Sequence, residues 1–108
     1  MLTTKDLSSS ERLKVWRRRL DKTQVQAAES HGVTTWEYRL LERGARSAPT
    51  VIIGSLQPHE ACAVMRWRSG YSRKDIARWV GISPWWVTQM ERGRIDSDRL
   101  INFWFSPL

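Results

Sequence analysis

The sequence predicts an all-α fold: two copies of one small unit, each with about four short helices, packed together. The first observation is an internal repeat, since a shift of 49 residues aligns Leu7–Gly44 with Leu56–Gly93 without a gap and gives eleven identities. Chance would give about two, so we infer a tandem duplication. The second observation is that residues typical of helix ends recur at matching places in both copies. Units of ~50 residues are marginal alone, so residues 1–54 and 55–108 are expected to share a core.

The first helix of each copy opens on a recognisable start signal. Ser8 and Glu11 have the spacing of a capping box, which predicts a helix running to about Arg19 or Leu20. Three apolar residues would share one face of this helix, Leu13, Trp16 and Leu20. In the second copy Pro58 suits a first helical turn, and the helix would run to about Arg68 with Cys62 as a small core residue.

The next two helices of each copy are separated by a glycine. Thr23 and Ser72 are predicted N-caps of helices over 24–30 and 73–80. Gly32 and Gly81 follow, where a left-handed residue costs least. Thr34 and Ser83 would then cap a third helix that ends at the sequence Glu-Arg-Gly, residues 42–44 and 91–93. A helix, a glycine turn and a capped helix make the helix-turn-helix layout.

A short fourth helix is predicted at the end of each copy. In the first copy it would cover Pro49–Ile53, before Gly54. In the second copy it would cover Asp98–Phe105, with Ser97 as its cap.

Charge narrows the range of partners. The chain has 18 Lys and Arg against 11 Asp and Glu, a net charge of +7 that both halves share. Such an excess favours nucleic acid as the partner, the alternative being a basic surface kept for solubility.

The lone Cys62 excludes an internal disulfide and a cysteine zinc site, and His31 and His59 lie far apart in sequence. We expect no enzyme activity, cofactor or metal, because the sequence shows no phosphate-binding glycine loop, nucleophile–base pair or metal cluster. His31 is expected to be a satisfied core or half-buried residue. The lack of a signal peptide or apolar spanning run predicts a cytoplasmic, nucleoid-associated protein without membrane contact.

Both units resemble the Cro/lambda-repressor-like helix-turn-helix family, also called the xenobiotic-response-element type. The first copy matches the family pattern at Arg17, Thr23-Gln24, Ala28, Gly32-Val33-Thr34 and Glu42-Arg43-Gly44. The second copy matches at Arg66, Ser72, Ala77, Gly81-Ile82-Ser83 and Glu91-Arg92-Gly93. The chain departs from the family in having Arg73 where glutamine is usual, polar Lys22 and His31 at usually apolar positions, shorter fourth helices and no fifth helix.

The resemblance implies a DNA-binding face on each unit. Gln24 and Arg73 would contact the DNA backbone at the start of the second helix. The third helices would enter the major groove, and arginines after them would clamp phosphates. The implied DNA-binding residues are Gln24, Thr34, Thr35, Trp36, Glu37, Arg39, Leu40, Arg43 and Arg46 in the first unit, and Arg73, Ser83, Pro84, Trp85, Trp86, Gln89, Arg92 and Arg94 in the second. Glu37 and Gln89 are the main candidates for a bidentate base contact.

The resemblance also implies residues that serve the fold. Arg17–Glu42 and Arg66–Glu91 would be structural ion pairs between the first helix and the end of the third. Four residues of the third helices would point inward, Tyr38, Leu41, Val87 and Met90.

The tryptophans leave a second interpretation open. Six aromatic residues are expected mostly in the core or between the units, Trp16, Trp67, Trp79, Phe103, Trp104 and Phe105. The positions that match Trp67 and Trp79 in the first copy are Arg18 and Ser30, which suggests an apolar face on the second unit. Self-association or a protein partner would then involve Trp67, Trp79, Trp85 and Trp86.

The combined expectation is a sequence-specific double-stranded DNA-binding transcriptional regulator, a repressor of a phage or mobile-element promoter. The alternative is an adaptor or antirepressor that binds protein through the aromatic face of the second unit. Salt separates the two, because DNA binding weakens steeply as salt rises whereas an aromatic interface barely responds.

Overall fold

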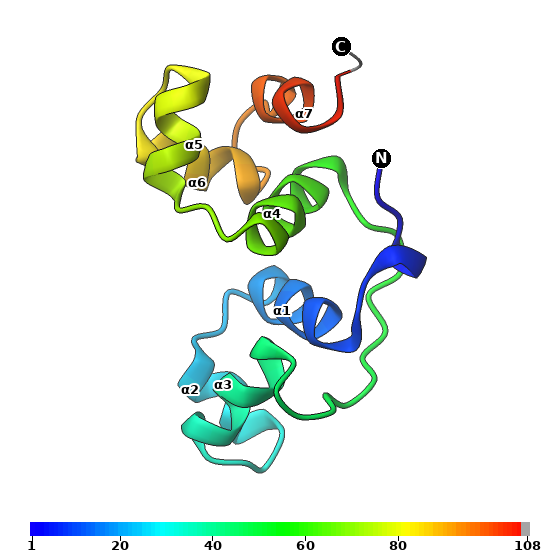
Figure 1. Ribbon diagram of the computed structural model, residues 1–108. Helices are drawn as coiled ribbons and strands as arrows, with labels where there is room; N and C mark the ends of the chain where they lie inside the picture. Colours follow the sequence, from blue (N-terminus) through cyan, green and yellow to red (C-terminus); the bar gives the residue numbers. More distant parts are fainter. Residues whose placement is uncertain (107–108) are drawn as a thin grey trace. The chain divides into compact units, whose positions relative to one another are not determined.

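Every regular element of the computed structural model, which describes residues 1–106, is helical (Figure 1). A short 3₁₀ helix, η1 (Thr4–Asp6), precedes the α-helices. These are α1 (Ser9–Arg19), α2 (Gln24–Ser30), α3 (Thr35–Arg43), α4 (Pro58–Ser69), α5 (Arg73–Val80), α6 (Pro84–Glu91) and α7 (Asp98–Phe105). The predicted all-α class is confirmed.

The chain divides into two units between Ser55 and Leu56. The N-terminal unit holds residues 3–55 with α1 to α3, and the C-terminal unit starts at Leu56, holds α4 to α7 and includes Met1 and Leu2. The first three helices of the two units begin 49 residues apart in each case, at Ser9 and Pro58, Gln24 and Arg73, and Thr35 and Pro84. The spacing of the sequence repeat is therefore also the spacing of the helix starts.

Local capping explains why the helices start where they do. The Thr23 hydroxyl accepts from the Gln26 N–H at 3.1 Å, and the Ser72 hydroxyl accepts from the Asp75 N–H at the same distance. Thr34 and Ser83 cap α3 and α6 in the same way. These four predicted N-caps are confirmed, and each satisfies a backbone donor that the first helical turn leaves free. Ser97 stands at the N-cap position of α7 as predicted, but its side chain makes no capping hydrogen bond.

The core of the N-terminal unit lies where α1, α2 and α3 meet. Leu13, Ala27, Ala28, Tyr38 and Leu41 are buried there. The prediction that Leu20 belongs to this face was wrong, since it is 52% exposed. The reason is that α1 ends at Arg19 and Asp21 adopts a left-handed φ of 52°, which turns the chain away from the helix axis.

The core of the C-terminal unit is built from α4, α5, α6 and α7. Its buried residues are Cys62, Ile76, Ala77, Val87, Met90 and Leu100. Cys62 is fully buried, as predicted, and burial raises the pKa of its thiol to about 12. The thiol therefore stays protonated and packs as a small apolar group. The inward positions predicted on the third helices are confirmed in both units.

Only one of the two predicted fourth helices exists. Asp98–Phe105 is helical as predicted, but Pro49–Ile53 is not. Four consecutive β-branched residues, Thr50 to Ile53, follow the proline, and their restricted side chains favour extended backbone over a helix of a single turn. The segment instead packs Val51 against the core and buries Ile53. Side chains hold it in place, since Arg19 donates to the carbonyls of Ile53 and Ser55 and the Thr4 hydroxyl donates to the carbonyl of Gly54.

The aromatic residues divide between core and surface. Trp16, Trp104 and Phe105 pack against the two cores, in line with the prediction, and Trp67 is half-buried. Phe103 corrects the prediction, because it is 39% exposed on α7, where Leu100 takes the buried position. Trp79 is 51% exposed. His31 is half-buried between Trp16 and Tyr38, with ring centroids 4.9 and 6.0 Å away, but its Nε2 has no hydrogen-bond partner among the described residues.

Candidate nucleic-acid interface

A buried ion pair ties α1 to the end of α3 in the N-terminal unit. Arg17 donates to both carboxylate oxygens of Glu42, at 2.6 and 3.1 Å, and also to the carbonyl of Lys22. The Glu42 side chain is only 2% exposed. Burial and this carboxylate together raise the pKa of the Tyr38 hydroxyl. The ion pair implied by the family resemblance is therefore confirmed, and it fixes the end of α3 relative to α1.

Gln24 extends this pair toward the surface. Its amide nitrogen donates to Glu42 at 3.2 Å, and its amide oxygen accepts from the Nε of Arg39 at 3.2 Å. The first residue of α2 is thereby connected both to the buried carboxylate and to an exposed arginine of α3. The helices α2 and α3 are therefore linked through one neutral side chain.

An open pocket of about 360 Å³ lies over this network. Lys14, Gln24, Arg39, Glu42 and Arg43 line it. Three cations and one carboxylate therefore line the pocket, and Arg17 already engages that carboxylate, so the pocket is a candidate site for an anion. Sequence reasoning brought Gln24, Arg39 and Arg43 forward but missed Lys14. A signal for Lys14 was available, since it lies three residues before Arg17 and therefore on the same face of α1.

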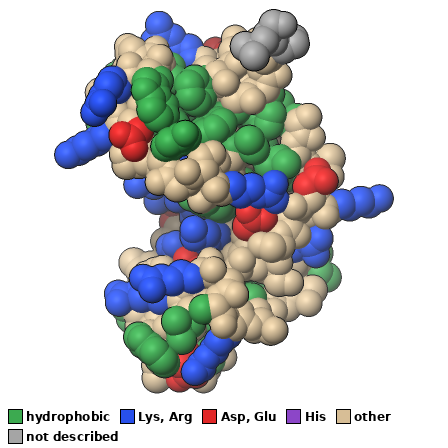
Figure 2. Space-filling model, viewed as in Figure 1, with side chains coloured by type: hydrophobic (Ala, Val, Ile, Leu, Met, Phe, Trp, Pro, Cys, Tyr) green, Lys and Arg blue, Asp and Glu red, His purple; other side chains and the backbone are tan. Residues whose placement is uncertain are grey.

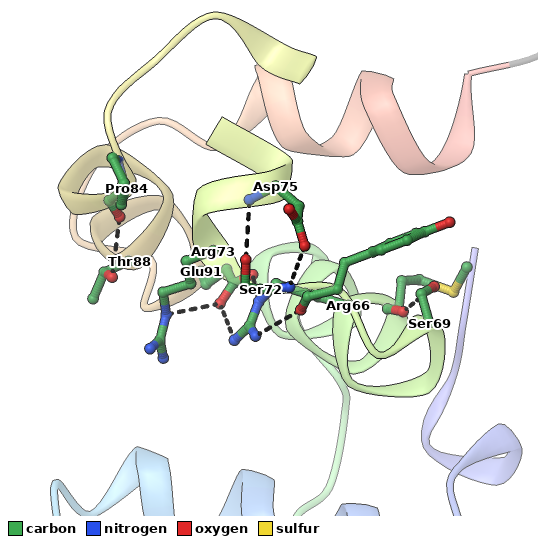
Figure 3. A network of polar contacts seen from close by, with 10 residues as sticks. Arg66, Ser69, Ser72, Arg73, Asp75, Pro84, Thr88 and Glu91 are labelled. Carbon is green, nitrogen blue, oxygen red and sulfur yellow. Dashed lines mark hydrogen bonds and ion pairs between the residues drawn. The ribbon is translucent and has the colours of Figure 1, made fainter. Parts of the chain in front are cut away.

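The C-terminal unit repeats the ion pair with a different neighbour. Arg66 donates to both oxygens of Glu91, at 2.7 and 3.0 Å, which confirms the second implied pair. Arg73 occupies the position of Gln24 in the repeat, and its Nε lies 3.8 Å from Glu91. Figure 3 shows Glu91 approached by both arginines. Burial, and next the positive charge of Arg66, lower the pKa of Arg73.

The position of Arg39 is also changed in this unit. Thr88 stands there in the repeat, and its hydroxyl donates back to the carbonyl of Pro84 within α6 at 3.2 Å (Figure 3). The C-terminal unit therefore has its additional cation, Arg73, on α5, and the N-terminal unit has its additional cation, Arg39, on α3.

The predicted reading faces begin with exposed aromatic rings. Trp36 is 63% exposed in α3, and Trp85 and Trp86 are 59% and 45% exposed in α6. The two adjacent tryptophans pack edge to face with centroids 4.9 Å apart. Such rings offer apolar contact to thymine methyl groups but few hydrogen bonds to base edges.

Glu37 is less available for base contacts than its position in the sequence suggests. One carboxylate oxygen accepts from the Thr34 hydroxyl at 3.0 Å and from the Thr34 N–H at 3.4 Å. The other lies 3.8 Å from Arg46, whose guanidinium also lies over the ring of Trp36 at 5.6 Å. Trp36, Glu37 and Arg46 thus form a second surface group, separate in its contacts from the pocket around Gln24.

None of the predicted DNA-binding residues is buried. The exposed ones are Thr34, Trp36, Arg39, Arg43, Arg46, Ser83, Pro84, Trp85, Trp86 and Arg94. The half-buried ones are Gln24, Thr35, Glu37, Leu40, Arg73, Gln89 and Arg92.

Comparison with known proteins gives no further guide. No protein-family model, curated protein or solved structure matches this chain significantly. Among the described residues, no helix is both long and apolar enough to span a lipid bilayer.

Proposed function

We propose that the protein is a sequence-specific double-stranded DNA-binding transcriptional regulator, which represses a phage or mobile-element promoter by occupying it. The observation that carries this proposal is the cationic pocket of the N-terminal unit, where Lys14, Arg39 and Arg43 gather beside the helix-turn-helix. Phosphate groups are among the anions that arginine and lysine bind through charge-assisted hydrogen bonds. The resemblance to Cro-like proteins points the same way.

The division of contacts in this proposal follows from the side chains. Phosphate contacts come from Lys14 and Arg43 in the N-terminal unit and from Arg73, Arg92 and Arg94 in the C-terminal unit. These contacts position the chain without reading sequence. Base readout comes from the first turns of α3 and α6, with Gln89 able to make a bidentate contact with adenine.

The first experiment selects preferred duplexes from a random library and measures the affinity of the best one between 50 and 200 mM salt. Neutralising ~6 phosphates should cost about three decades in affinity over that range. A flat salt response, or no preference for the selected duplex over an unrelated one, would contradict the proposal.

Two variants of equal charge change sharpen the test. Arg43→Ala should weaken binding to all duplexes and reduce the salt slope by about one. Lys5→Ala removes a positive charge from exposed η1 in the same unit and should leave both unchanged. Equal effects of the two variants would mean that only net charge matters.

Repression is tested separately with the selected duplex placed across a reporter promoter. Expression should fall when the wild-type protein is made. It should recover with Arg43→Ala/Arg92→Ala, because occupancy requires the phosphate contacts. Increased expression with the wild-type protein would instead identify an activator.

A further inference from the structure

Three aromatic rings of the C-terminal unit form a contiguous exposed surface. Tyr71 precedes α5, Trp79 lies in the last turn of α5, and Phe103 lies on α7. The centroids of Tyr71 and Trp79 are 4.8 Å apart, and those of Trp79 and Phe103 are 6.4 Å apart. The residues are 44%, 51% and 39% exposed. We call them the aromatic surface; Figure 2 shows hydrophobic side chains gathered over α5 and α7 on the face in view.

The fold does not require aromatic rings at this place. The repeat matches Tyr71 and Trp79 with Lys22 and Ser30 in the N-terminal unit. There the lysine ammonium donates to the serine hydroxyl at 2.6 Å, so the same two positions are joined by a polar contact. The N-terminal unit therefore joins these two positions by a hydrogen bond, whereas the C-terminal unit joins them by contact between exposed aromatic rings. The rings therefore call for an explanation beyond stability.

The exposed area favours a small partner over a second copy of the chain. At roughly 200 Å² for an aromatic side chain, the three exposed fractions offer less than ~300 Å². A stable protein interface needs about 800 Å² from each partner. A few aromatic anchors of this size suit a short peptide segment, whose binding energy such residues dominate.

The charges beside the aromatic surface favour an acidic partner. Arg78 immediately precedes Trp79 in the sequence, and Arg99 lies one helical turn before Phe103 on α7. Both arginines are exposed. The acidic neighbour Asp75 accepts a hydrogen bond from the Ser72 N–H at 3.0 Å, so its charge is engaged by the helix start. A second copy would bring further arginines against these, and like charges across an interface are costly.

We propose that Tyr71, Trp79 and Phe103 form a docking surface for a short acidic segment of another protein that carries apolar anchors. The surface shares no residue with the proposed DNA-binding set. The chain would thus bind DNA through one set of residues and recruit, or be restrained by, an acidic partner through the other.

The test uses two synthetic peptides of equal length with leucine and phenylalanine at helical spacing. One carries glutamate at its remaining positions and the other lysine. Each is titrated into the full chain without DNA, and binding is followed by the indole resonances of the tryptophans. The glutamate peptide should bind and shift the Trp79 resonance, and the lysine peptide should not. Absence of glutamate-peptide binding, or equal binding of both peptides, would overturn the proposal.

A double variant locates the binding. Tyr71→Lys/Trp79→Ser installs the residues that the N-terminal unit carries and should weaken peptide binding about tenfold or more, as expected for lost aromatic anchors. Trp85→Ala/Trp86→Ala removes two exposed rings elsewhere on the same unit and should leave the peptide affinity unchanged. The reverse order would refute the assignment. Sedimentation provides the last arm: a dimer that disappears only in Tyr71→Lys/Trp79→Ser would show a second copy as the occupant. Since DNA is absent throughout, failure here is distinct from failure to bind DNA.

Discussion

Each of the two units contains a buried Arg–Glu pair, and the charged residues beside the pair differ between the units. In the N-terminal unit the neutral Gln24 connects Glu42 to Arg39, which remains exposed on α3. In the C-terminal unit Arg73 itself approaches Glu91, and the α6 position that matches Arg39 holds Thr88. The additional cation thus lies on different helices in the two units, whereas the glutamate occupies the same position of the repeat in both. This comparison indicates that the glutamate is the fixed structural part of each network and that the cation beside it is adaptable.

The largest expected effect comes from removing the carboxylate. Glu91→Gln should lower the free energy of unfolding by about 3–5 kcal/mol, because the buried Arg66 loses its counter-charge, and the partly exposed Arg73 loses a second, longer contact with the same carboxylate. Glu42→Gln should cost less, since only Arg17 has a direct ion pair with that carboxylate. Urea unfolding of both variants decides the order, with exposed Glu29→Gln as the control that should change little. Equal losses from Glu42→Gln and Glu91→Gln would show that the second arginine is irrelevant.

Exchanging the neighbours tests the charges themselves. Arg73→Gln gives the C-terminal unit the neutral neighbour of the other unit and removes a charge that burial, and next the repulsion from Arg66, disfavours. Its melting temperature should be unchanged or higher, whereas its DNA affinity should fall and its salt slope decrease by about one. Gln24→Arg should lower the melting temperature, because the new cation would face Arg39. A lower melting temperature for Arg73→Gln would mean that Arg73 serves the fold.

A smaller difference lies at the end of the first helix. Asp21 has a φ of 52°, and the matching residue of the C-terminal unit is Gly70, with a φ of 73°. A left-handed conformation costs a residue with a side chain about 1 kcal/mol more than it costs glycine. Asp21→Gly should therefore stabilise the chain by up to that amount, and Gly70→Asp should destabilise it similarly. A lower melting temperature for Asp21→Gly would show that the Asp21 side chain contributes more stability than its left-handed backbone costs.

The smallest effect concerns the caps of α2 and α5. The N–H of Ser72, first, and its hydroxyl lower the pKa of Asp75 below 3.8, whereas the matching residue Gln26 does not titrate. A carboxylate whose pKa is lower in the folded chain than in the unfolded chain stabilises the fold at neutral pH. This stabilisation is lost as the pH falls through the lowered pKa. The amide resonance of Ser72 should therefore titrate with a midpoint below 3.8, and that of Thr23 should not move. A midpoint at or above 3.8 would argue against the capping contact.

Sequence reasoning predicted best what is decided within a few residues. Thr23, Ser72, Thr34 and Ser83 each act on an amide three residues away, so the helix starts could be placed correctly. Nothing in the sequence marks the left-handed conformation of Asp21, and the wrong placement of Leu20 followed from that. The helix predicted over 49–53 is missing partly because of a distant residue. Arg19 donates to the carbonyls of Ile53 and Ser55 and so holds the segment extended.

The candidate site could be predicted in part for a related reason. The two Arg–Glu pairs followed from the family resemblance, residue by residue. Lys14 lies on the same face of α1 as Arg17, but that it joins Arg39 and Arg43 is decided by the packing of α1 against α3, which the sequence does not show. The availability of Glu37 was overestimated because its carboxylate is engaged by Thr34 and approached by Arg46, which periodicity alone does not reveal.

The extended segment over residues 49–55 also bears on how long the protein survives in a cell. The core of the C-terminal unit includes Leu100 of α7. The N-terminal unit has at the matching place an extended segment, which packs Val51 against the core, buries Ile53 and accepts hydrogen bonds from Arg19 and Thr4. Local opening of a stretch held by so few contacts requires far less free energy than global unfolding. A protease would therefore cut here first, and its rate would follow the population of this local opening. The lifetime of the whole chain would then depend on how firmly Arg19, Thr4 and the packing of Val51 hold this one segment.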